Sequence, residues 1–335
     1  MIEWMDAARV AVEVSTRLRP GENAVMVTDS RVRDFPNCRD LIDAVIAAAN
    51  YVGAEVTTVE FAARTIPNEE LPRQVAAAMA AADVVYLLPT MGAIHTQANR
   101  RARDAGARIL VLGSATSYGT GDVLVRLAPR SAEEIDDWAR LTTRLASRFK
   151  RGGHLHVTTR KGTDLRCEVG VLNVHTMDAQ YREPGGYTHF IPGLAGGGAT
   201  PGSYTGTLVV DASITPVARP LLGENPVVLE IREGYVRGVE GGSAAKEWGL
   251  AAAALNDPTA YHAAEYGFGC HPRARVPFGR PTNDERLYGA FHMGIGTNVS
   301  YGGKIQSKWH VDAIATAATA TLDGELLVQD GVYQI

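Results

Sequence analysis

The stretch VVYLLPTMGAIHTQANRRARDAGARILVL, from Val84 to Leu112, decides the fold class of the first half of the chain. It opens with a continuous apolar run, passes through a loop at 89–96 and a polar segment of helical character, and closes with a second apolar run after Gly106. Two short apolar strands joined by a helix are typical of a βαβ unit, in which the strands run parallel. This stretch therefore predicts a parallel sheet.

The same alternation continues outward from this unit. Further strands are predicted at 24–28 and 55–61, and further helices at 2–18, 40–52, 69–82 and 131–149. Strands that alternate with such helices favour an α/β domain with a parallel, Rossmann-like sheet, which we place at residues 1–150. Ligands bind beyond the carboxyl ends of the strands in such sheets, and the loop that contains His95 follows one of these strands.

The second half of the chain has a different pattern. From His154 onward, short strand-like runs are separated by glycine turns such as Gly185-Gly186 and Gly196-Gly197-Gly198, and one helix is predicted at 246–255. This pattern predicts an α+β, mainly antiparallel C-terminal domain at residues 151–335. The polar, glycine-bearing segment 150–153 is the expected boundary between the two domains.

The composition fits a folded enzyme. The 335 residues correspond to about two domains, and 45% of them are apolar and 21% charged. The net charge of −4 is dispersed, so no basic stripe indicates a nucleic-acid or membrane partner. We expect no signal peptide, because the opening MIEWMD is acidic, and no apolar run approaches the roughly 20 residues of a membrane span. Three cysteines without a CxxC pair favour a reducing compartment, so we expect a cytoplasmic protein.

A candidate metal site lies in the second half. His310 and Asp312 are two residues apart, a spacing that places both side chains on one face of a strand. Glu265 and His292 are each followed by alternating glycines, which allow close backbone packing. We predict that Glu265, His292, His310 and Asp312 form one mononuclear metal site. The alternative is that each is an ordinary hydrogen-bonded polar residue of the core or of a loop.

Four motifs follow one another in the same half: Asn256-Asp-Pro258, Gly267-Phe-Gly269, Gly302-Gly-Lys304 and His310-Val-Asp312. With weaker matches from Asp83 to Tyr333, they resemble the 2,5-dihydroxypyridine 5,6-dioxygenases. These are Fe(II)-dependent ring-opening enzymes of nicotinic acid catabolism. They are themselves related to the M29 metallo-aminopeptidases.

The resemblance implies a metal centre with a modified set of ligands. The dioxygenases hold iron with two histidines and one aspartate, and His310 and Asp312 match two of these. The third position is Glu265 here, and His292 stands where the dioxygenases have an apolar residue. The aminopeptidases have glutamate and histidine at these two places, as this chain does. The expected cofactor is one divalent ion, Fe(II) first, with Mn or Zn as alternatives.

A second metal ion is not expected. The aminopeptidases need further glutamates, one near 196–200 and one near Leu287, and we find no carboxylate at either place. A dinuclear peptidase is therefore disfavoured. Neither NAD nor flavin is expected, because Gly119-x-Gly121 lacks the third glycine and the following helix of a dinucleotide motif.

Other residues are candidates for contact with the substrate. His95 matches the acid/base histidine of the dioxygenases, although it could be an ordinary loop histidine. We expect His95 to reach over the metal site from the first domain, so that the active site is a cleft between the domains. His189 and Tyr301 are candidate substrate contacts. The remaining histidines are assigned supporting or structural roles: His262 and His271 beside Glu265, and His154, His156 and His175 in strands or turns.

Three functions remain open on this basis. The first is a mononuclear Fe(II) dioxygenase that opens a small hydroxylated N-heteroaromatic ring, with His95 managing a proton. The second is a single-metal hydrolase that cleaves an amide or peptide, with Glu265 as ligand or base. The third is a family member that binds a ligand without catalysis. The relatives also imply a homo-oligomer whose partner is a small-molecule substrate.

Overall fold

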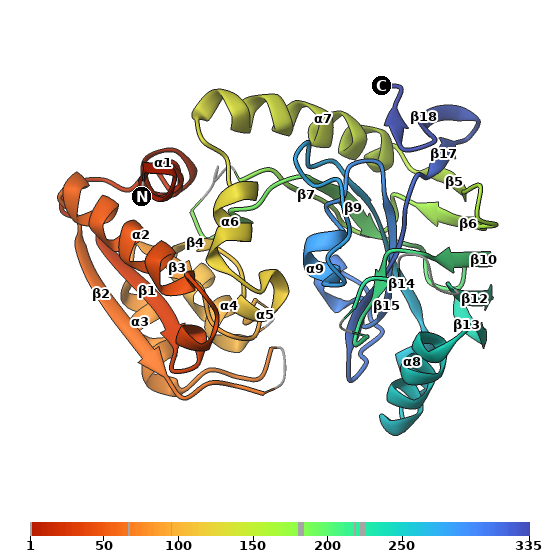
Figure 1. The fold of residues 1–335 in the computed structure, drawn as a ribbon, viewed down its shortest axis with the longest axis horizontal. Coiled ribbons are helices and arrows are strands. Elements are labelled where there is room, and N and C mark those ends of the chain that lie inside the picture. The colour runs from red at the N-terminus through yellow and green to blue at the C-terminus, as the bar shows by residue number, and fades with distance from the viewer. Residues whose placement is uncertain (1, 66–67, 95, 180–183, 218, 222–225) are drawn as a thin grey trace. The chain divides into compact units, whose positions relative to one another are not determined.

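The computed structural model describes residues 2–65, 68–94, 96–179, 184–217, 219–221 and 226–335. These residues form two compact units (Figure 1). The first contains residues 1–139 and 177–192, and the second contains residues 140–176 and 193–335. The segment 177–192 therefore belongs to the first unit, although it lies within the second half of the sequence.

A five-stranded parallel sheet, in the order β2-β1-β3-β4-β8, forms the centre of the first unit. Its strands are β1 (Asn23–Asp29), β2 (Glu55–Phe61), β3 (Val84–Leu87), β4 (Arg108–Val111) and β8 (Tyr187–His189). Val84 pairs with Arg108 in parallel, and α4 (Gln97–Asp104) connects the two strands. This confirms the predicted parallel sheet. All four residues of β3 are buried, as expected for a strand that is covered on both faces.

Helices surround this sheet. They are α1 (Ile2–Arg9), α2 (Cys38–Val52), α3 (Arg73–Ala81), α5 (Ala115–Tyr118), α6 (Gly121–Leu127) and the first part of α7 (Ala132–Lys150). The predicted helix at 2–18 continues after Arg9 as a π-helical turn, Val10–Ser15. α4 begins where the Thr96 hydroxyl accepts a hydrogen bond from the Asn99 amide at 3.2 Å, an N-cap typical of threonine.

Two sheets with antiparallel pairing form the second unit. The eight-stranded sheet has the order β13-β12-β10-β6-β5-β17-β18-β19, and the six-stranded sheet has the order β11-β16-β15-β14-β9-β7. The strands of the larger sheet are β5 (Gly153–Thr158), β6 (Asp164–Val169), β10 (Thr205–Val210), β12 (Val227–Arg232), β13 (Tyr235–Glu240), β17 (Thr319–Leu322), β18 (Glu325–Gln329) and β19 (Val332–Tyr333). Those of the smaller sheet are β7 (Val174–Met177), β9 (Leu194–Gly198), β11 (Ser213–Ile214), β14 (Ala263–Gly269), β15 (Phe291–Gly296) and β16 (His310–Ala315). The predicted antiparallel character of this half is confirmed.

The core of the second unit fills the space between its sheets and helices. Tyr266, Phe268 and Met293 from the smaller sheet join Val157 from the larger one in a single apolar cluster. Phe149, near the end of α7, stacks on Phe268 with ring centres 5.7 Å apart. α8 (Ser243–Ala254) adds Trp248, which is fully buried, and α9 (Pro281–Asp284) is a short helix before β15. Because side chains alternate along a strand, the other face of the smaller sheet is free to carry polar residues.

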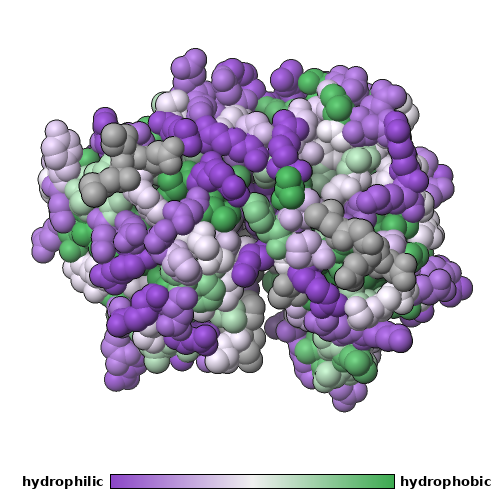
Figure 2. All heavy atoms as spheres, in the orientation of Figure 1, coloured by the Kyte–Doolittle hydropathy of each residue, from purple (hydrophilic) through white to green (hydrophobic). Residues whose placement is uncertain are grey.

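Apolar side chains on the surface are dispersed. The exposed large ones include Tyr51, Val171, Leu250 and Val276. Figure 2 shows hydrophobic residues scattered among hydrophilic ones over the visible face. Among the described residues, no helix combines the length and apolar character that crossing a membrane would need.

Candidate metal centre

The four predicted metal ligands lie on one face of the smaller sheet of the second unit. Glu265 comes from β14, His292 from β15, and His310 and Asp312 from β16. The register places Glu265 opposite Gly294, and Gly294 opposite Asp312. The residues between them, such as Tyr266, Met293 and Ala313, point into the apolar core. The alternation of the strands thus separates a polar face from the core.

Glycines make room for these side chains. An added Cβ at Gly267 would lie 2.1 Å from the ring of His292, which is its partner in the register. An added Cβ at Gly294 would lie 2.7 Å from the carboxylate of Glu265 and 2.9 Å from the ring of His310. The alternating glycines that first indicated a site are therefore needed to let its side chains lie across the neighbouring strands.

The polar atoms of these residues converge. The Glu265 carboxylate lies 3.3 Å from His292 Nε2 through Oε1 and 2.9 Å from His310 Nε2 through Oε2. His310 Nε2 is 3.6 Å from Asp312 Oδ1. Glu265, His292 and Asp312 each offer a ligand atom within 4.8 Å of the other two. Glu265 and His292 are buried, and His310 and Asp312 are partly exposed.

One hydrogen bond determines the orientation of His310. Its Nδ1 lies 2.9 Å from the carbonyl oxygen of Thr297, which can only accept, so Nδ1 carries a proton. Nε2 then faces the Glu265 carboxylate either as a lone pair, which needs a cation between the two groups, or as a second N–H. A backbone carbonyl that holds the outer nitrogen of a histidine is typical of metal sites.

The charges of the cluster favour a bound cation. Burial opposes charge on Glu265, but hydrogen bonds from His292 and His310 outweigh it and hold the Glu265 pKa well below its usual range. Burial alone would lower the pKa of His310, but Glu265 and Asp312 together raise that pKa to about 10. Burial raises the pKa of Asp312, and the negative charge of Glu265 adds to this effect. Without a metal, protons on the imidazoles would have to balance the carboxylates.

The donor set fits a divalent metal ion. Two ligands about 2.1 Å from an ion and at a right angle to each other are about 3.0 Å apart, and the closest separations here are 2.9 and 3.3 Å. His292 Nδ1 and Asp312 Oδ1 are buried without a hydrogen-bond partner among the described residues. Imidazole and carboxylate donors suit Fe(II), Mn(II) and Zn(II). The described residues of the second unit could therefore hold one such ion.

His175, for which the sequence predicts a structural role in a strand or turn, also lies at this site. It lies on β7, and its Nε2 is 3.9 Å from Glu265 Oε1. Its ring stacks on Tyr301, with centres 5.2 Å apart and planes 26° from parallel. Tyr301, a predicted substrate contact, also lies 6.1 Å from the ring of His310. No local motif marks His175, because only the neighbouring positions of β7 and β9 in the sheet bring it close to β14.

A buried ion pair near the site was also missed. Glu285 pairs with Arg286, whose side chain is fully buried. Burial raises the pKa of Glu285 to about 7, and the negative charges of Asp312 and Glu265 contribute, while Arg286 opposes the shift. Glu285 lies two residues before Leu287, close to where the resemblance to the aminopeptidases implies a further glutamate ligand. The Glu285 carboxylate instead forms the buried ion pair with Arg286.

The other predicted residues lie elsewhere or are not described. His95 lies outside the described residues, so its role remains a prediction. His189 lies on β8 of the first unit, buried and close to Tyr187. His262 Nδ1 lies 2.9 Å from the carbonyl oxygen of Gly296, which supports the end of β15. His156 pairs with Asp164 on the larger sheet.

Comparisons with known proteins agree with this fold. The family model of NicX, 2,5-dihydroxypyridine 5,6-dioxygenase, matches residues 3–335. A 2,5-dihydroxypyridine 5,6-dioxygenase of Pseudomonas putida KT2440 is 26% identical over 312 residues, which are 87% of this chain and 86% of the relative. The solved structure of 2,5-dihydroxypyridine dioxygenase from the same organism superposes with a TM-score of 0.80 at 23% identity, over 98% of this chain and 96% of the other. AmpT from Thermus thermophilus shares the fold, with a TM-score of 0.63 at 14% identity over 100% and 99% of the two chains. Because the family model covers nearly the whole sequence, this chain belongs to the 2,5-dihydroxypyridine 5,6-dioxygenase family.

Proposed function

We propose that the protein is a mononuclear non-haem Fe(II) dioxygenase that opens the ring of a small hydroxylated N-heteroaromatic compound such as a dihydroxypyridine. The observation that carries the proposal is the convergence of Glu265, His292, His310 and Asp312 on one sheet face. It supports this function because the chain belongs to a family named for that reaction.

The ligands differ from the two-histidine, one-carboxylate set that is common in non-haem Fe(II) oxygenases. Here two imidazoles are accompanied by two carboxylates, whose charges balance those of a divalent ion. Bound Fe(II) would relay electrons from the ring to O₂, so that the reaction needs no other reductant.

Other residues of the chain would orient the metal ligands and take part in proton transfer. The bond to Thr297 keeps the His310 ring in one orientation, and Gly294 leaves room for Glu265 and His310 to meet. His95 would move the proton of a ring hydroxyl, as the resemblance implies, because a histidine changes its charge near neutral pH.

The test is O₂ consumption by protein purified anaerobically and loaded with Fe(II), with 2,5-dihydroxypyridine as substrate. We expect O₂ uptake to match loss of the pyridine absorbance in equal amounts. Zn(II)-loaded protein is the control, because Zn(II) has no redox chemistry. If Fe(II) reaches one ion per chain and no O₂ is consumed, the proposal is wrong.

A single-metal hydrolase is the second candidate. The observation in its favour is that Glu265, a carboxylate, stands where the dioxygenases have a histidine ligand, so the site resembles that of the aminopeptidases. In this case the ion would lower the pKa of a bound water, and Glu265 would serve as ligand or base. Release of the amine from aminoacyl anilides by the Zn(II) form, without O₂ uptake by the Fe(II) form, would favour it.

A further inference from the structure

His175 is a buried imidazole whose nitrogens have no partner. Neither Nδ1 nor Nε2 makes a hydrogen bond to any residue that the structure describes, and neither atom is accessible to solvent. The side chain as a whole retains 26% of its accessible area, so other atoms of the residue are exposed. Buried polar atoms are almost always hydrogen-bonded in native proteins. We therefore expect a bound molecule to provide the hydrogen-bond partner of His175.

The position of His175 indicates where this partner lies. Nε2 faces Glu265 Oε1 across 3.9 Å, which is too long for a direct hydrogen bond. The ring stacks on Tyr301, with the ring centres 5.2 Å apart. Tyr301 in turn packs beside Gly198, where an added Cβ would lie 2.8 Å from Tyr301 Cβ and 2.8 Å from Leu172 Cδ1. His175 is thus fixed at the edge of the metal centre with its unpaired nitrogen turned toward the ligands.

His175 lies outside the closely spaced ligand atoms. Glu265, His292 and Asp312 lie within 4.8 Å of one another, and His310 is 2.9 Å from Glu265 and 3.6 Å from Asp312. His175 comes within 3.9 Å of Glu265, whereas the His310 nitrogen lies within 3.6 Å of both carboxylates. This difference favours contact with a molecule bound beside the ion, and iron binding by His175 is the alternative that the experiment below distinguishes.

We propose that His175 is a substrate-contacting residue that forms a hydrogen bond with an oxygen of the hydroxylated ring bound beside Glu265. The inference deepens the proposed function and rests on it. It assigns to His175 and Tyr301 one side of the substrate site: Tyr301 positions the imidazole by stacking, and His175 provides the polar contact that distinguishes a hydroxylated ring from one without the hydroxyl.

The experiment compares three variants with the wild type in the Fe(II)-loaded, anaerobic protein. His175→Phe keeps a ring that can stack on Tyr301 but removes both nitrogens, and His175→Gln restores a hydrogen-bonding group. His154→Phe, at an exposed histidine on β5, is the matched control. Iron content is measured first. The dissociation constants of 2,5-dihydroxypyridine, 2-hydroxypyridine and 3-hydroxypyridine are then measured by anaerobic titration.

We expect every variant to hold one ion per chain. His175→Phe should bind 2,5-dihydroxypyridine about 10- to 100-fold more weakly than the wild type, as expected for one lost hydrogen bond. His175→Gln should recover part of this loss, and His154→Phe should bind normally. With one of the two monohydroxylated compounds, the wild type and His175→Phe should bind equally, which would identify the hydroxyl that His175 contacts.

Two results would overturn the inference while leaving the proposed function intact: unchanged affinity of His175→Phe for 2,5-dihydroxypyridine, or loss of iron from that variant, which would make His175 a metal ligand. If iron-loaded wild-type protein does not bind 2,5-dihydroxypyridine at all, the proposed function fails, and this inference fails with it.

Discussion

The side chains of Glu265 and His310 approach each other across Gly294 of β15. They come from β14 and β16, which lie on either side of β15, and their carboxylate and imidazole are 2.9 Å apart because the glycine between them has no side chain. The candidate metal centre thus depends on three strands in one register. A slip of one residue in β15 would bring Met293 or Ile295 to this face.

Gly294→Ala is expected to damage the site more than the fold. The new methyl group would lie 2.7 Å from Glu265 and 2.9 Å from His310, so both side chains must move. Overpacking of this kind costs about 1–3 kcal/mol of stability. We expect the variant to fold with a lowered melting temperature and to lose most of its metal, as measured by calorimetry and elemental analysis.

Gly249→Ala is the matched control for this variant. Gly249 lies in α8, and an added Cβ there has no neighbour within 4 Å. Replacement of a helical glycine by alanine stabilises by up to about 1 kcal/mol. Normal metal content in Gly294→Ala would show that metal binding does not require the close approach of Glu265 and His310 at Gly294.

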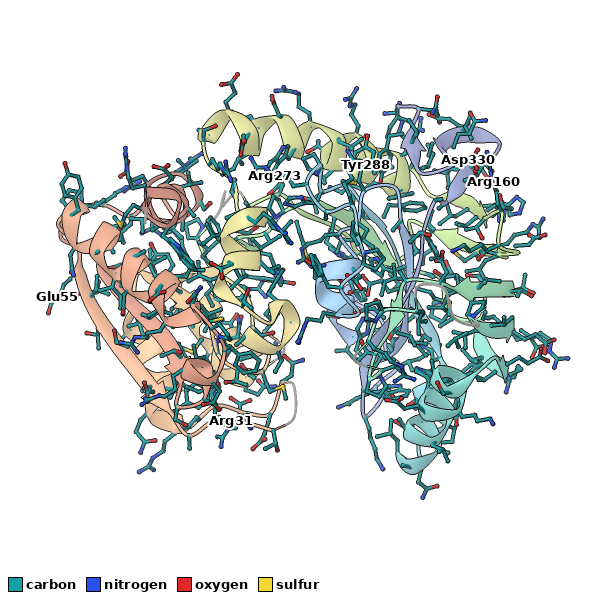
Figure 3. All side chains as sticks on the ribbon, in the orientation of Figure 1. Arg31, Glu55, Arg160, Arg273, Tyr288 and Asp330 are labelled. Atoms are coloured by element: carbon teal, nitrogen blue, oxygen red, sulfur yellow. The ribbon has the colours of Figure 1, made fainter. Side chains whose placement is uncertain are left out.

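His310→Ala and Asp312→Ala are each expected to fold and to lose the ion. A catalytic centre has few protein ligands, so removal of one should leave well below one ion per chain after dialysis. Arg160→Ala is a suitable control, because Arg160 forms an exposed pair with Asp330 at 2.6 Å (Figure 3). Full metal occupancy in both ligand variants would remove β16 from the metal site.

Much of the candidate metal centre, as a cluster of side chains on one sheet face, could be predicted because its signal is local. Side chains two residues apart share a strand face, and the glycines that follow Glu265 and His292 indicate close packing of the neighbouring strands. These patterns require no knowledge of which strands are neighbours. The parallel sheet could be predicted for the same reason, from the alternation of strands and helices in the first half.

The features that could not be predicted depend on contacts between distant segments. His175 reaches the site only because β7 lies beside β9, and the local sequence does not encode this pairing. The strand Tyr187–His189 pairs with β4 in the first unit. The chain therefore returns to the first unit at this segment, and the composition of the segment does not indicate this. Glu285 is important because it is buried together with Arg286. In the sequence the two are only adjacent charged residues in a loop, and this pattern does not reveal that they are buried.

A single metal ion per chain is the next expectation. The space beside Gly198 is occupied by Leu172 and Tyr301, and Glu285 is already paired with Arg286. The carboxylate of Asp284 accepts hydrogen bonds from the amides of residues 278–280. Among the described residues near β9 and Leu287, these pairings leave no carboxylate to complete a second site. Elemental analysis and calorimetric titration with Fe(II) or Zn(II) should give one ion. Two ions, which in two-metal hydrolases lie about 3.5–4 Å apart, would favour the hydrolase instead.

The three cysteines should be unreactive in the folded protein. All are buried, and burial raises the pKa of Cys38 to about 11 and those of Cys167 and Cys270 to about 12. The thiolate is the reactive form, so a raised pKa leaves these thiols neutral at pH 8. Iodoacetamide should modify none of them at pH 8 and all three after unfolding. Rapid labelling of the native protein would show that one of these side chains is accessible.

His95→Ala tests the proton-transfer role. In the sequence, His95 stands between β3 and α4, and ligands bind beyond the carboxyl ends of the strands in α/β folds. The described residue Thr90, which follows β3, is anchored, because its amide and hydroxyl both donate to the buried Asp29 carboxylate at 2.6 Å. General acid–base catalysis contributes about 10²- to 10⁴-fold to a rate. We therefore expect His95→Ala to keep its metal and its affinity for 2,5-dihydroxypyridine while kcat falls by that factor. His95→Gln should show the same fall, because glutamine can hydrogen-bond but cannot change its charge. If His95→Ala turns over like the wild type, the proton must be moved by another group.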